Sequence, residues 1–139
     1  MRTHLIAPLL QTLFVCLFTA VIALPAAAAE LKSQKTAGGG VTVTVTPQIL
    51  AQDAKTWDFK IVLDTHSQDL RDDLMKSAAL LDGSGARHAP VAWDGAAPGG
   101  HHRTGVLRFK PISPRPQAVE LQISRPGESA PRAFRWQLQ

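Results

Sequence analysis

Apolar and polar residues alternate over several short stretches of this chain. Residues 41–46 alternate valine with threonine, and residues 57–63 set aromatic and aliphatic side chains against mostly polar ones. Successive side chains of a β-strand point to opposite faces, so each stretch predicts a strand with one buried face. The same pattern predicts further strands at residues 105–110, 119–123 and 134–138.

The middle of the chain carries two competing patterns. From Asp69, a candidate helix cap, leucine and alanine recur at helical spacing. The sequence Asp-Gly-Ser-Gly at 82–85 is instead typical of a hairpin turn. We therefore expect, in order, a helical turn at 69–75, a strand at 77–81 and its return strand at 87–93.

Many short strands joined by glycine- and proline-rich turns favour one fold class. We predict an all-β, immunoglobulin-like antiparallel β-sandwich of about seven strands, with one short helical turn. Pro47 should end the first strand, because proline cannot donate to a ladder. Residues 30–40 are polar and glycine-rich and predict a flexible linker, which leaves 41–139 as the sandwich domain.

Residues 1–29 have the organisation of a secretory signal peptide. Arg2 precedes an apolar run at 5–24, and small residues follow as far as Ala29. The pattern predicts export to the periplasm or the extracellular space, cleavage after Ala29, and no membrane span once the signal is removed. Lipid attachment at Cys16 and retention of the apolar run as an uncleaved anchor are the alternatives to this cleavage. Cys16 is also the chain's one cysteine, so the exported protein would form no internal disulfide.

The charge balance is mildly basic. The chain has a net charge of +4, to which the signal contributes Arg2. So small an excess on an exported protein argues against a nucleic-acid partner. A polyanionic partner, such as anionic lipid or polysaccharide, would need a basic strip on neighbouring strands. The candidate members of that strip are Arg108, Lys110, Arg125, Arg132 and Arg135.

A protein partner is the other possibility, and it could add a strand at an uncovered edge such as 41–46.

Residues 93–105 stand out in composition, with four glycines, two histidines, an aspartate and a tryptophan. A Trp-Asp pair, a glycine pair and His101-His102 precede a Gly-x-Leu-x-Phe strand. This segment, together with Leu-Asp-Thr-His-Ser at 63–67, resembles small exported bacterial domains of immunoglobulin-like type, most of them of unknown function. The resemblance implies the fold and carries over no catalytic residue.

The histidines suggest a metal, because imidazole suits copper and zinc. Adjacent residues of a strand point to opposite faces, so His101 and His102 could share an ion only on an irregular loop. His66, with Asp64 as a fourth ligand, would have to come alongside. A copper or zinc binding protein that uses these residues is the alternative function. A histidine that packs under a sheet and bonds a backbone carbonyl or Asp64 is the structural interpretation of the same residues.

No catalytic motif emerges from the chain. Asp64, His66 and Ser67 are too close in sequence to form a relay at a strand end. The sequence contains no Gly-x-Ser-x-Gly, His-Glu-x-x-His or phosphate-loop pattern. We therefore expect a non-catalytic exported module that binds or scaffolds a partner and needs no cofactor.

Overall fold

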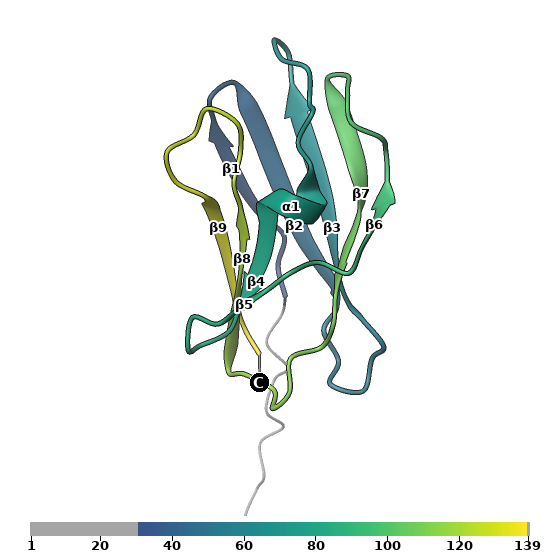
Figure 1. Cartoon of the computed structure of the whole chain (residues 1–139), viewed down its shortest axis with the longest axis vertical. Helices are drawn as coiled ribbons and strands as arrows, with labels where there is room; N and C mark the ends of the chain where they lie inside the picture. The colour runs from purple at the N-terminus through teal and green to yellow at the C-terminus, as the bar shows by residue number, and fades with distance from the viewer. Residues whose placement is uncertain (1–30, 139) are drawn as a thin grey trace, which may run out of the picture.

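The computed structural model describes residues 31–138, which form two antiparallel sheets and one short helix (Figure 1). The five-stranded sheet contains, in spatial order, β1 (Gln34–Gly38), β2 (Val41–Ile49), β3 (Trp57–Thr65), β7 (His102–Phe109) and β6 (Ala92–Gly95). The four-stranded sheet contains β5 (Arg87–His88), β4 (Ala78–Leu81), β8 (Ala118–Ile123) and β9 (Arg132–Gln137). Helix α1 (Leu74–Ser77) precedes β4.

The strand order confirms the predicted fold class. The strands β2-β3-β7-β6 form one sheet and β5-β4-β8-β9 the other. This is the ABED and C′CFG order of the immunoglobulin architecture, with β1 added before the first strand.

The core lies between the two sheets and consists of the inward-facing residues of the alternating stretches. Phe59 on β3 meets Phe109 on β7 edge-to-face, with ring centroids 5.8 Å apart. Phe59 also meets Trp136 on β9 of the opposite sheet, at 5.5 Å. Each such aromatic side chain buries on the order of 150–250 Å². The predicted inward direction of these residues is confirmed.

The linker prediction for 30–40 is wrong from Gln34 onward. Strand β1 pairs antiparallel with β2, from Gln34 opposite Val45 to Gly38 opposite Val41. Strand β2 is consequently an inner strand, and the prediction that 41–46 is an uncovered edge is wrong as well. Strand β2 also continues past Pro47 to Ile49 through an irregularity in its pairing with β3. Proline is tolerated there because β1 begins opposite Val45 and does not cover this part of β2.

The helical turn lies later than predicted, at α1 rather than at 69–75. Asp69 does not cap it. The Asp69 carboxylate accepts a hydrogen bond from the Gly100 backbone N–H at 2.6 Å instead. Strand β4 lies within the predicted range 77–81.

The predicted return strand at 87–93 is divided between the two sheets. Strand β5 pairs with β4, and the chain then crosses to the other sheet, where β6 pairs with β7. Buried Pro90 lies in the crossing segment, where proline can neither donate to the ladder nor vary its φ. One predicted strand therefore becomes two short ones on opposite layers.

The described residues 31–138 include no helix that is long and apolar enough to cross a membrane. The predicted signal peptide and Cys16 lie outside these residues.

Candidate functional site

Trp93 accounts for two of the glycines in the unusual segment. Its indole lies across Gly105, where an added Cβ would stand 2.6 Å from the Trp93 ring. A Cβ on Gly95 would stand 2.4 Å from the Cα of Gly105. The guanidinium of buried Arg103 lies 5.7 Å from the centre of the same ring. These glycines allow β6 and β7 to approach closely beneath a tryptophan, which is a packing role and not ligand binding.

The four predicted metal ligands come only partly together. The pairing of β3 with β7 places Asp64 opposite His102, and the Asp64 carboxylate is hydrogen-bonded to Nδ1 of His102. The backbone carbonyl of His101 accepts a hydrogen bond from the Thr65 N–H at 2.9 Å, and His66 is exposed. Within residues 31–138, no three His, Cys, Asp or Glu side chains form a group that could hold a metal ion. Copper or zinc binding stays a prediction from the sequence.

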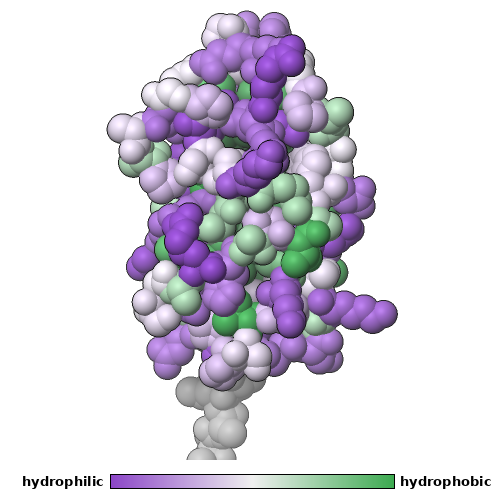
Figure 2. All heavy atoms as spheres, viewed as in Figure 1, coloured by the Kyte–Doolittle hydropathy of each residue, from purple (hydrophilic) through white to green (hydrophobic). Residues whose placement is uncertain are grey.

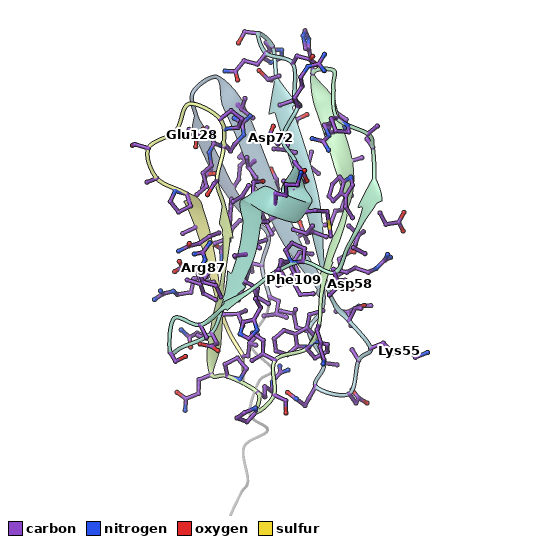
Figure 3. The ribbon with its side chains drawn as sticks, in the orientation of Figure 1. Lys55, Asp58, Asp72, Arg87, Phe109 and Glu128 are labelled. Atoms are coloured by element: carbon purple, nitrogen blue, oxygen red, sulfur yellow. The ribbon has the colours of Figure 1, made fainter. Side chains whose placement is uncertain are left out.

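The prediction of a basic strip is wrong. Strands β7 and β9 belong to different sheets, and their arginines are paired with carboxylates. Buried Arg125 donates from Nε (2.9 Å) and Nη2 (3.1 Å) to the two oxygens of buried Asp72. Figure 3 shows Asp72 near Glu128, at the end of the sandwich opposite the C-terminus. The other arginines of the predicted strip are also paired: Arg132 with Glu128, Arg135 with Glu120, and Arg108 with Asp58 and Asp94.

A hollow lies at the other end of the sandwich, between the turn after β4 and the loop after β7. It has a volume of about 610 Å³. Its apolar lining comes from Ile112, Pro114, Pro116 and Ala118, and its polar lining includes Asp82, His88, Arg115 and Gln117. An adjoining hollow of about 460 Å³ shares His88, Ile112 and Ser113 with it and extends to Val91. We call the two together the end groove.

The charged groups of the end groove are held in place. Oδ1 of Asp82 accepts hydrogen bonds from the Ser84 hydroxyl (2.6 Å) and from the Ser84 and Ala86 N–H groups (2.9 and 3.1 Å). Oδ2 of Asp82 lies 3.2 Å from Nε2 of His88. The hydrogen bonds from Ser84 and His88 lower the pKa of Asp82 to about 2. Asp82 is therefore an anion at every physiological pH, and His88 donates to it from Nε2.

The other wall of the end groove is anchored through Arg115. This side chain donates from Nη1 to the Leu50 carbonyl at 2.5 Å. Its guanidinium also lies 5.7 Å from the ring of buried Trp57. A flexible arginine is thus fixed between the core and the loop, and the proline-rich loop has a rigid attachment.

This arrangement favours binding over catalysis. Ser84 donates to the carboxylate of Asp82 and not to His88, so the imidazole does not activate this hydroxyl. What remains is Nδ1 of His88, the ring nitrogen that does not contact Asp82, beside an apolar lining. Such a combination of apolar walls with a few oriented polar groups is typical of ligand pockets.

Sequence reasoning missed the end groove. The turn at 82–85 and the prolines at 111–116 were recognised only as chain reversals. The spacing of Asp82 and His88 across a two-strand hairpin was the available signal, since a tight turn brings its flanking residues together.

The fold and the groove define a small immunoglobulin-like β-sandwich without a disulfide in its described residues and with a hollow at one end. Comparison of the chain with family models, with curated proteins and with solved structures finds no match.

Proposed function

We propose that this protein is an exported, non-catalytic binding module that takes its ligand in the end groove. The observation that carries the proposal is the groove itself, a hollow of about 610 Å³ with apolar walls and a few fixed polar groups. Its volume lies within the range of ordinary small-molecule and side-chain pockets, about 300–1,000 Å³.

The polar groups specify the ligand's chemistry. The carboxylate of Asp82 is occupied by Ser84, Ala86 and His88, so His88 Nδ1 is the acceptor that this pair leaves available. A matching ligand has an apolar body that covers Ile112 and a hydrogen-bond donor that reaches the imidazole. An apolar amine, amide or alcohol has this composition, as does a side chain of a larger partner.

The test is a screen of small apolar amines, amides and alcohols against the ¹⁵N-labelled protein, followed by backbone amide chemical shifts. We expect hits to shift the amides of residues 82–88 and 110–118. Gln117→Trp should fill the groove and abolish these shifts. Gln52→Trp, at an exposed position in the turn between β2 and β3, should leave them unchanged. Hits that map elsewhere, or that survive Gln117→Trp, would contradict the proposal.

The proposed export, which the signal-like pattern of residues 1–29 supports, has its own test. Mass spectrometry of the mature N-terminus should find Glu30 as the first residue. A diacylglyceryl group on Cys16 would instead show lipid attachment, and an intact residue 1 would count against export through a cleaved signal.

A further inference from the structure

Strand β6 ends the five-stranded sheet and has a free hydrogen-bonding side (Figure 1). Ala96 donates its N–H to the Thr104 carbonyl at 3.0 Å, and β6 pairs with β7 through Trp93 opposite Leu107. Antiparallel partners bond at every second residue. The N–H and C=O groups of Trp93 and Gly95 therefore point away from β7, towards the outside of the sheet.

The other sheet edges of the described chain are less accessible. The Gln34 side chain on β1 donates to the Arg135 carbonyl on β9 (2.6 Å) and accepts from the Arg135 N–H (3.3 Å). The edges β1 and β9 thus cover each other. Strand β5 has two residues and offers too short a template for pairing. The end of β2 that extends beyond β1 contains Pro47, which has no N–H to donate. Among residues 31–138, β6 is therefore the free edge best suited to a partner strand.

Apolar side chains lie beside this free edge. Val91, immediately before β6, is 54% exposed, and Met75 on α1 is 38% exposed. Helix α1 contacts β6. Figure 2 shows hydrophobic residues gathered in the middle of the face on which α1 and the segment between β5 and β6 lie. A strand added to β6 would cover part of this surface.

The side-chain charges beside this edge indicate which partner strands could pair with β6. Asp94 is the outward residue of β6, and its side chain is 71% exposed. It shares Arg108 with Asp58, each at 3.3 Å, so two carboxylates contact one guanidinium and a net negative charge remains. Lys60 stands two strands away in the same row, at a separation where salt screens most of its effect.

A second copy of this chain is a poor occupant. Antiparallel pairing of two β6 strands through Trp93 and Gly95 would set Asp94 directly opposite its own counterpart. Like charges at opposed positions destabilise a strand pair. The negative charge instead favours a partner strand with lysine or arginine at this position.

We infer that β6 is a docking edge for an extended segment of another polypeptide, which adds to the sheet as a strand. Its backbone pairs with Trp93 and Gly95, a basic side chain lies opposite Asp94, and an apolar side chain covers Val91. This is strand addition, in which the main chain supplies affinity and alternate side chains supply specificity. The inference concerns a different surface from the end groove and stands independently of it.

The probe is a library of random twelve-residue peptides displayed on phage and selected on the purified protein. We expect enriched peptides to alternate apolar residues with lysine or arginine. A synthetic peptide of the enriched sequence should slow hydrogen exchange at the Trp93 and Gly95 amides. Asp94→Lys should weaken its binding at least fivefold, and Asp94→Asn by a smaller factor.

The matched control is Asp53→Lys, the same charge change at an exposed turn, which should leave binding unchanged. Circular dichroism should show both lysine variants folded, because the exposed Asp94 side chain makes its ion pair in the described chain with Arg108 alone. Equal binding by wild type and Asp94→Lys, or protection confined to residues 82–88 and 110–118, would overturn the inference. Absence of any enriched peptide, or dimerisation of the protein through β6 in sedimentation, would overturn it too.

Discussion

The two flanks of the sandwich differ in how their strand edges are treated. On the flank between β1 and β9, the Gln34 amide bonds both backbone groups of Arg135, as a neighbouring strand residue would. On the flank between β6 and β5, the outward backbone groups of Trp93 and Gly95 face no strand of the described chain. Unpaired edges are a liability in isolated sheets. We call the flank between β1 and β9 the sealed flank and the flank between β6 and β5 the free flank.

The sealed flank is also the more strongly charged of the two. Buried Arg132 donates to the carbonyls of Gly38 (2.6 Å) and Val41 (2.8 Å) from the opposite sheet. Glu128 accepts two further hydrogen bonds from it, at 2.5 and 3.0 Å. One guanidinium thus connects the β1–β2 turn to the loop before β9. On the free flank, β6 and β7 pack closely because the Trp93 ring lies across Gly95 and Gly105.

Removing the Arg132 guanidinium from the sealed flank should cause the largest loss in the free energy of unfolding. Arg132→Met keeps the aliphatic stem but leaves Glu128 and the carbonyls of Thr36, Gly38 and Val41 without their donor. Glu128 is partly exposed and keeps Arg125 at 3.6 Å, so most of the cost comes from the unpaired backbone carbonyls, for a total of about 2–3 kcal/mol. We expect urea unfolding to show a loss of free energy of this size.

Arg135→Met on the same strand is the matched control. Its side chain is 68% exposed and pairs with Glu120, so its loss should cost no more than about 1 kcal/mol. Equal losses in the two variants would show that burial of Arg132 does not hold this flank together.

A methyl group under Trp93 tests the free flank. The Cβ of Gly105→Ala would stand 2.6 Å from both Gly95 Cα and the Trp93 ring, so the indole must move. We expect a loss of about 1–3 kcal/mol in the free energy of unfolding. Gly83→Ala introduces the same group where nothing lies within 4 Å, and it should change stability by less than about 0.5 kcal/mol. An unaltered Gly105→Ala protein would contradict the packing role of the glycines.

Opening the sealed edge should have a smaller effect on stability and a distinct effect on association. Gln34→Ala removes both hydrogen bonds to Arg135 and should cost about 1 kcal/mol. It also exposes the backbone of β9, so sedimentation velocity should show concentration-dependent self-association that the wild type lacks. Gln52→Ala is the exposed control. Monomeric behaviour of Gln34→Ala would show that this side chain is not needed to block the edge.

Acid should reduce the contribution of the sealed flank to stability, and we expect this to be the smallest of the effects on stability. The hydrogen bond and charge of Arg132, with Arg125, lower the pKa of Glu128 in the folded protein. A lowered pKa contributes stability that is present above the unfolded value and is lost as pH falls through the folded value. We expect the difference in unfolding temperature between wild type and Arg132→Met to narrow below about pH 4.5. A difference that is constant down to pH 2 would contradict this linkage.

Strands whose inner face meets the apolar core could be predicted from the sequence, and β1 could not. Val41, Val43 and Val45 alternate because they are buried beneath the opposite sheet. Gln34 and Thr36 occupy the same inner face of β1, but there they meet the backbone and the arginine of β9. Polar side chains suit that environment. Strand β1 therefore has the polar composition that is typical of a linker.

The candidate site was only partly predictable for a related reason. Alternation shows which residues of a strand face inward but not which sheet receives the strand. The division of 87–93 between β5 and β6 was therefore hidden, and the free edge with it. Pairing of Arg125 with Asp72, distant in sequence, was equally hidden and removed the expected basic strip. The contact of Asp64 with His102 was among the alternatives because both flank predicted strands.

Native-state amide hydrogen exchange, resolved by residue, tests the contrast between the flanks most directly. The Arg135 amide, bonded to Gln34, should be strongly protected and should lose that protection in Gln34→Ala. The amides of Trp93 and Gly95 should exchange rapidly in the free protein. Comparable protection of Arg135, Trp93 and Gly95 in the free protein would contradict the existence of one sealed and one open edge.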